Sequence, residues 1–234
     1  MRLSSLRTGT LALGLGAAVA SLPAVAESEQ DPWEGFNRSV FEFNETIDRY
    51  AMRPIANGYR YVTPDIVEQG VSNFFGNVAE IGDTVNSLLQ FKFDDAGSSF
   101  ARLTFNTTFG LLGVLDVATP MGIESQDEDF GQTLGYWGVE SGPYLVLPFI
   151  GASTVRDGAA LVVDVNLDPV GLVDDVPTRN SLYALQLVDL RSRLLKAEQI
   201  ISGDRYSFVR DAYLQRRAYM INDGAVSVQY DQDF

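Results

Sequence analysis

The residues that most often carry enzymatic chemistry at neutral pH are missing from this chain of 234 residues, which has no histidine and no cysteine. Without imidazole or thiolate there is no Ser-His-Asp or Cys-His nucleophile, no zinc knuckle and no disulfide. Carboxylates, hydroxyls and amines remain, and these groups rarely activate a nucleophile unaided. The composition therefore predicts a protein that is not an enzyme and that needs no cofactor or metal.

Two short motifs come close to known catalytic or metal sites. Gly138-Val-Glu-Ser-Gly142 places a serine between glycines, but two residues separate Gly138 from Ser141, so the spacing is not that of a nucleophile elbow. Asp164-Val-Asn-Leu-Asp168 has the start of a calcium loop, but Pro169 stands where that loop needs glycine and no glutamate closes it. We interpret Asp168-Pro169 as a turn, in preference to a calcium site. The acidic run at 126–129 is interpreted as a solvated loop, with a bridging divalent ion as the alternative.

The first 26 residues have the order of a secretory signal peptide. Arg2 and Arg7 form a basic region, residues 11–20 are apolar, and Ala24-Val-Ala26 fits the small-x-small rule for cleavage before Glu27. The apolar run is shorter than the ~20 residues that span a bilayer, which disfavours the alternative of an uncleaved anchor. We therefore expect an exported protein with a folded domain at 27–222 and a disordered tail at 223–234.

The charge balance restricts the possible partners. The chain has a net charge of −14, and removal of the leader, which contains two arginines and no acid, makes the balance more negative. An acidic surface repels the phosphates of nucleic acids and anionic headgroups. We therefore expect no nucleic acid partner, and any contact with a membrane must come from burial of apolar surface.

Amphipathic helices are the elements that would position any site. Apolar residues recur at spacings of three and four along residues 31–50, 63–90, 94–109, from 178 or 180 to 201, and 204–222. Asp31, Asp94 and Asp204 are predicted N-caps, with Pro32 and Glu34 completing a capping box. The stripe of the first helix comprises Trp33, Phe36, Val40, Phe43, Ile47 and Tyr50. Such a stripe faces either a protein core or a membrane interface.

The middle of the chain has a different pattern. Five glycines lie within residues 131–151, between β-prone runs at 136–139 and 144–147. This pattern predicts a hairpin or ordered loop that turns near Glu140-Ser-Gly142, and it argues against a helix there. The alternative is a long connecting loop. The predicted fold class is mainly α, with one glycine-rich insert.

Several blocks, in order along residues 31–217, resemble the MlaA (VacJ) family. The blocks are Asp31-Pro-Trp-Glu-Gly-Phe-Asn-Arg38, Arg53-Pro54, Ser72-Asn-Phe-Phe-Gly-Asn77, Asn106-Thr-Thr-Phe-Gly-Leu-Leu-Gly113, Asp116-Val-Ala118, Phe130-Gly-Gln-Thr-Leu-Gly-Tyr-Trp-Gly138, Gly142-Pro-Tyr-Leu-Val-Leu-Pro148, Arg156-Asp157 and Arg210-Asp-Ala-Tyr-Leu-Gln-Arg-Arg217. The resemblance implies a ring of helices within the periplasmic leaflet of the outer membrane, pierced by an amphipathic channel. It implies intermembrane transport of mislocalised phospholipid, with trimeric porins and an MlaC-like periplasmic carrier as partners.

Under this resemblance, a small set of residues is predicted to border the lipid path or its hairpin: Phe36, Asn37, Phe43, Asn44, Gly138, Gly142 and Tyr144. The chain departs from the family at one point, because members are commonly lipoproteins with an acylated cysteine and this chain has none. Anchoring would then depend on the helix ring and a porin. The alternatives are a soluble periplasmic scaffold or binding protein, and, disfavoured by the missing histidine, a phospholipase.

Overall fold

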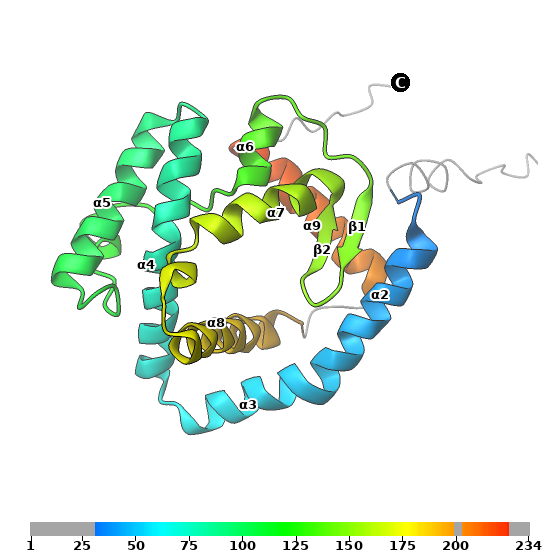
Figure 1. Ribbon diagram of the computed structural model, residues 1–234, viewed down its shortest axis with the longest axis horizontal. Coiled ribbons are helices and arrows are strands. Elements are labelled where there is room, and N and C mark those ends of the chain that lie inside the picture. Colours follow the sequence, from blue (N-terminus) through cyan, green and yellow to red (C-terminus); the bar gives the residue numbers. More distant parts are fainter. Residues whose placement is uncertain (1–30, 199–202, 225–234) are drawn as a thin grey trace, which may run out of the picture.

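Figure 1 shows the computed structural model, which describes residues 31–198 and 203–224. The predicted cleavage site at Ala26 and Glu27 and most of the predicted tail lie outside the described residues. The fold is mainly helical, as predicted. In chain order the elements are α2 (Glu34–Ile47), a π-helical segment (Asp48–Met52), α3 (Arg53–Val62), α4 (Asp65–Leu89), α5 (Phe93–Phe109), a 3-10 turn (Thr119–Met121), α6 (Phe130–Tyr136), β1 (Tyr144–Leu147), β2 (Gly151–Thr154), α7 (Val155–Leu167), a 3-10 turn (Pro169–Leu172), α8 (Val176–Ala197) and α9 (Arg205–Ile221).

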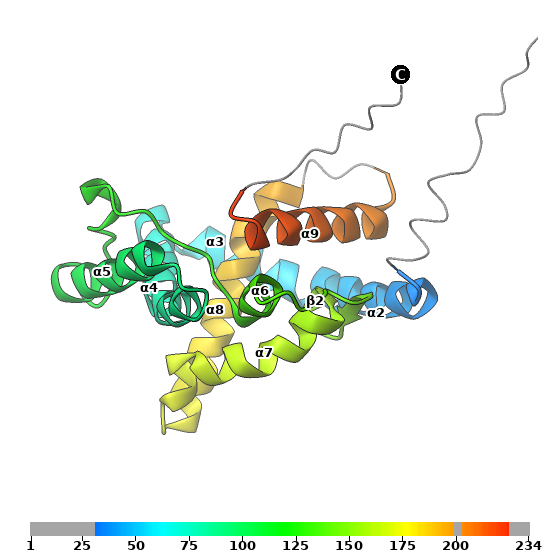
Figure 2. The ribbon, with the colours of Figure 1, turned by 90° about the horizontal axis from the view of Figure 1, so that it is seen from above.

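The elements are arranged as a ring. Helices α2 and α3 form one bent arc through the π-helical segment, α3 packs on α8, and α8 packs on α4. From α4 the ring continues through α6 and α7 to the hairpin, and β1 closes it by packing against α2 (Figure 1). Helix α5 runs beside α4 on the outside of the ring, while α9 packs against α6 and β2 (Figure 2). Segments far apart in sequence therefore face one another across the ring.

Two of the three predicted helix caps are wrong. Helix α2 begins after Trp33 and has no side-chain cap, because Asp31 lies 3% exposed in a tertiary network instead. Helix α5 begins two residues earlier than a cap at Asp94 requires, with Lys92 at the N-cap position, so that Asp94 lies within its first turn. Asp204 does occupy the N-cap position of α9, but it binds the side chains of Ser207 and Arg38. A carboxylate that can reach a buried partner gains more there than a cap provides.

The glycine-rich region differs from the sequence prediction in two ways. Residues 130–136 form the helix α6, which was not expected; Asp129 caps it by accepting a hydrogen bond from the amide of Gln132 at 2.8 Å. The strand predicted at 144–147 is present as β1, but it pairs with β2, so the turn lies at 148–150 and not at Glu140-Ser-Gly142. Phe149 makes this turn with a φ of +66°. No glycine marks that position, so the sequence carried no signal for it.

The distribution of polar and apolar side chains is inverted relative to a soluble globular protein. Among the described residues, most buried side chains are polar or charged, and four of the nine buried apolar residues are alanines. Large apolar side chains lie outside instead, on α2 to α5 and on the segment after α5. They include Phe36, Tyr61, Ile66, Phe91, Phe93, Phe100, Phe109, Leu111 and Leu112. Exposed apolar surface on this scale marks a membrane or protein interface. None of the described helices combines the length and the hydrophobicity needed to cross a bilayer.

Candidate functional site

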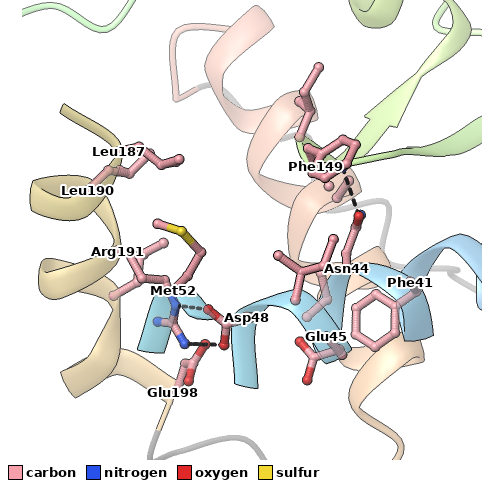
Figure 3. Close-up of a pocket in the computed structure, with 16 residues that line it drawn as sticks. Phe41, Asn44, Glu45, Asp48, Met52, Phe149, Leu187, Leu190, Arg191 and Glu198 are labelled. Atoms are coloured by element: carbon pink, nitrogen blue, oxygen red, sulfur yellow. Dashed lines mark hydrogen bonds and ion pairs between the residues drawn. The ribbon is translucent and has the colours of Figure 1, made fainter. Parts of the chain in front are cut away.

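A cavity of about 310 Å³ lies inside the ring (Figure 3). Its walls come from α2, the π-helical segment, the turn of the hairpin, α8 and α9. Most of the lining is apolar, with Phe41, Met52, Phe149, Leu187 and Leu190 among the contributing side chains. These residues lie up to 149 positions apart in the sequence, so only closure of the ring creates the cavity.

Charged side chains form one end of this cavity. Arg191, on α8, donates to Asp48 of the π-helical segment from Nε and Nη2, and Nη2 also lies 2.9 Å from Glu198 (Figure 3). Arg53 and Arg205 each pair with Glu198 at 2.8 Å. Burial raises the pKa of the Asp48 carboxyl, but the hydrogen bond and charge of Arg191 outweigh this, so that the pKa lies below its ordinary value. The cavity thus has apolar walls, and at one end the arginines and carboxylates are paired with one another.

Two asparagines of α2 attach the hairpin to the ring. Asn37 is fully buried; its Nδ2 donates to the carbonyl of Tyr144 at 3.0 Å, and its Oδ1 accepts from the amide of Val146 at 2.9 Å. Asn44, seven residues on, repeats the pattern with the carbonyl of Leu147 and the amide of Phe149. Residues seven apart share one helix face, so the two amides bind the free edge of β1 as a neighbouring strand would.

A buried network holds Asn37 in place from the other side. Its Nδ2 also donates to Oδ1 of Asp31 at 2.7 Å, and Oδ2 of Asp31 accepts from the hydroxyl of Tyr206 at 2.5 Å. Arg210 lies 3.6 Å from the same carboxylate. Burial is the main cause that raises the pKa of Tyr206, and the neighbouring Asp31 carboxylate raises it further. The network joins the start of α2 to α9 and thereby fixes the edge that Asn37 presents to β1.

The aromatic residues and glycines of the predicted site lie at several different places in the fold. Phe36 is exposed, and Phe43 packs edge-to-face on Phe149 with ring centroids 5.4 Å apart. Tyr144 is fully buried and packs against Tyr206, and burial raises its pKa to about 12. Gly138 and Gly142 flank the connection between α6 and β1 with φ of +87° and +65°. Of the predicted set, Asn44 alone lines the large cavity, while Asn37, Asn44 and Tyr144 belong to the hairpin attachment.

Two smaller cavities adjoin the first. One of about 170 Å³ shares Ile150 and Ala152 with the large cavity and is also lined by Arg217. The next, of about 230 Å³ between α4, the 127–129 loop, α7 and α8, shares Asp129 and Asp164 with it. The ring therefore contains neighbouring cavities, of which the one at the hairpin is mostly apolar and the one beside α4 is lined by several acids.

Sequence reasoning missed several residues of these cavities. The helix spacing assigns no site role to Leu187 or Arg191, and a lone acid in a helix, such as Asp83, has no local signature. The segment Asp164–Asp168, noted for its calcium-like spacing, does line the acidic cavity. There, Asp164 accepts from the amide of Phe130 and Asp168 from that of Val170, and no cluster fit to hold a metal ion occurs among the described residues.

Comparisons with known proteins agree on one family. The family model described as MlaA lipoprotein matches residues 29–220. The chain is 36% identical to the "Intermembrane phospholipid transport system lipoprotein MlaA" of Shigella flexneri and 35% identical to that of Escherichia coli (strain K12), in each case over 98% of this chain and 92% of the relative. A solved structure described as "Structural basis for maintenance of bacterial outer membrane lipid asymmetry" matches with a TM-score of 0.72 and 32% identity, covering 82% of this chain and 99% of that one.

Proposed function

Because this chain belongs to the MlaA family, we propose that it performs intermembrane phospholipid transport at the outer membrane, removing mislocalised phospholipid from the outer leaflet. The names of the relatives support this function. The structural observation that carries it is the inverted burial around a ring that encloses cavities with apolar and polar walls. Such a ring can shield the acyl chains of a phospholipid from water and provide polar groups for its headgroup.

The acyl chains and the headgroup make opposite demands on a path. A two-chain phospholipid has roughly thirty methylenes, and at ~0.8 kcal/mol each their exposure to water would cost on the order of 20 kcal/mol. An unpaired charge in hydrocarbon also costs several kcal/mol. The apolar walls at Leu187, Leu190 and Phe149 suit the chains, whereas the polar groups farther along the ring suit the headgroup. No covalent step is required.

The proposal extends to location and partners. Residues 1–26 act as a leader that is removed before Glu27, and the mature domain lies in the periplasmic leaflet. The exposed aromatic residues of α2 to α5 contact lipid tails or a trimeric porin. An MlaC-like carrier receives the phospholipid on the periplasmic side. The chain has no cysteine that could be acylated. Its apolar surface and the porin therefore attach it to the membrane, in place of the acyl anchor of the lipoproteins in the family.

Photo-crosslinking tests the transport path directly. A photoreactive residue is placed at Leu190, which lines the large cavity, and in a matched variant at Ala184, which lies exposed on the same helix and lines none of the described cavities. Irradiation in native membranes should give a phospholipid adduct at 190 in excess of that at 184, detected by mass spectrometry of the purified protein. Equal adducts at both positions, or none, would contradict a lipid path through the ring.

A deletion experiment separates transport from the alternatives. Loss of the gene should increase outer-leaflet phospholipid, and the protein should remain with membranes until detergent is added. Release into the periplasmic fraction without detergent would instead favour the soluble scaffold. Incubation of the purified protein with labelled phospholipid should leave the lipid intact, whereas lysolipid in excess of the protein would indicate a phospholipase.

A further inference from the structure

Asp83 is a buried carboxyl group that lacks a cationic partner. It lies in α4, is only 7% exposed and lines the acidic cavity. Its Oδ1 accepts the backbone amide of Glu128 at 3.0 Å, and among the described residues no hydrogen bond reaches its Oδ2 and no arginine or lysine pairs with it. An unpaired buried carboxyl is costly, so native proteins rarely retain one without a use.

The other buried carboxylates of the described chain are treated differently. Glu80 lies 2.6 Å from Arg102, Asp189 lies 3.2 Å from Arg193, and Asp31 is neutralised by the network around Arg210. The fold therefore supplies an arginine wherever a carboxylate is buried for structural reasons. Among the described residues, no arginine lies beside Asp83, and the carboxyl lines the acidic cavity instead.

The surroundings of Asp83 add further negative charge. Asp164 and Asp168 line the same cavity and bind only backbone amides, whereas the cations nearby are already engaged: Lys92 with Glu128 and Asp223, Arg216 with Asp127, and Arg217 with Asp129 and Asp157. Burial raises the pKa of Asp83 to about 8, and the charges of Glu80, Asp127 and Glu128 add to this effect. A cation bound beside Asp83 would lower this pKa again, so the carboxyl would ionise as the cation enters.

We propose, resting on the transport function above, that this cavity binds the primary ammonium of an aminophospholipid headgroup, with Asp83 as the carboxylate that receives it. A cavity of about 230 Å³ holds far more than one water molecule, which needs ~10–15 Å³, so an organic headgroup fits. A bare metal ion fits less well, because none of the described carboxylates forms a cluster with metal-ligand spacing. Gln186 provides a neutral acceptor beside the same space, whereas the amide of Asn86 is already bonded to Thr133 and Gly82.

The adjoining cavity gives the rest of the headgroup room beside the ammonium. The two cavities share Asp129 and Asp164, so they are neighbours. Arg217 lines the adjoining cavity, but its Nη1 and Nη2 are paired with Asp129 and Asp157 and its Nε is buried. The proposed recognition therefore rests on the ammonium alone. The apolar cavity, which shares Ile150 and Ala152 with the adjoining one, suits the acyl chains.

The test compares headgroups on matched acyl chains. The purified full-length protein in detergent is incubated with phosphatidylethanolamine and phosphatidylglycerol in equal amounts, and the retained lipids are measured by mass spectrometry. The wild type should retain phosphatidylethanolamine in roughly tenfold excess, the effect of one charge-assisted hydrogen bond. Asp83→Asn should abolish the excess while retaining phosphatidylglycerol at the same level. Asp174→Asn, which removes an exposed charge outside the cavities, should behave as the wild type.

Further measurements identify the chemistry and separate the two proposals. N-acetylated phosphatidylethanolamine, which has lost the ammonium, should be retained like phosphatidylglycerol, and free ethanolamine in excess should not displace the intact lipid. Displacement by free ethanolamine would mean that the cavity binds soluble amines and would overturn the assignment to a lipid. A wild type without headgroup preference, or an Asp83→Asn variant that keeps it, would overturn the proposal while leaving transport intact. Retention of no phospholipid of either kind would instead contradict the transport function.

Discussion

Replacing Asn37 should detach the hairpin from α2. In Asn37→Ala the amide of Val146 loses its acceptor and the carbonyl of Tyr144 loses a donor, both in a site that is fully buried. Leaving a buried polar group unsatisfied costs ~1–3 kcal/mol, so the two together predict a loss of about 2–6 kcal/mol in the free energy of unfolding. This is a large part of the ~5–15 kcal/mol that stabilises a typical domain.

The matched comparison is Asn44→Ala, which removes the same two bonds from a partly exposed site where water replaces them. We expect about 1 kcal/mol there, and no loss for Asn57→Ala, because Asn57 is exposed on α3. Hydrogen exchange followed by mass spectrometry would measure protection of the amides of β1, and thermal unfolding in detergent would measure stability. If the protection of the Val146 amide in Asn37→Ala equalled that of the wild type, the two asparagines would not be the attachment of the hairpin, and the reasoning would be refuted.

Four other outcomes are expected. Because the pKa of Asp83 is about 8 in the fold and 3.8 ordinarily, the folded state binds the extra proton between these values, and the stability of the lipid-free protein should fall as pH rises from 4 to 8. Asp83→Asn should be more stable than the wild type by about 4 kcal/mol at pH 7, whereas an unchanged pH profile of stability in this variant would argue against the raised pKa. Arg191→Leu should cost about 1–2 kcal/mol, because Asp48 would lose its two hydrogen bonds to Arg191 and keep the longer contact with Arg53 at 3.4 Å. The loss should shrink as Asp48 is protonated at low pH, and a pH-independent loss in chemical denaturation would point to packing alone. Gly142→Val should destabilise the fold by about 1–2 kcal/mol and slow transport, because the φ of Gly142 is +65° and a Cβ there would lie 3.3 Å from Val155. Normal lipid asymmetry in the variant would show that this segment is a connecting loop without a part in transport. Extraction from membranes should need detergent and should be insensitive to salt, and elution by high salt alone would show that a charged partner holds the protein.

The helices were predictable because their signals are local. The spacing of three and four apolar residues places α4, α5 and α9 within a few residues of their observed bounds, and Asp204 and Gly110 lie at helix ends as their residue types indicate. The same spacing cannot say which face is buried. In this protein the apolar faces of α2 to α5 lie largely outside, so the stripe that would form a core in a soluble protein forms the surface instead.

The sequence also singled out two asparagines of the first helix but gave no indication of the contacts that they make. Asn37 and Asn44 stand out on one face of the first helix, but their partners lie more than 100 residues away on β1. The hairpin turn was misplaced for the same reason: Phe149 adopts a positive φ with no glycine to announce it, held by the bond from its amide to Asn44 and by the contact of its ring with Phe43. Asp31 left its predicted cap because the fold brought Tyr206 and Arg210 within reach.

The sequence by itself therefore determined the helices α2, α4, α5, α8 and α9, the absence of His- or Cys-based chemistry and, through ordered blocks of residues, the family. Tertiary structure alone decided which side of each helix faces outward, where the hairpin turns and where charge is left unpaired. Asp83 illustrates the reason, because nothing in its neighbourhood in α4 distinguishes it from Glu80, three residues earlier. Glu80 meets Arg102 across the packing of α4 on α5, whereas Asp83 meets a cavity where α4 approaches α6, α7 and α8. Periodicity reports on the helix that carries a side chain, and the free energy of that side chain depends on what the other helices place opposite it.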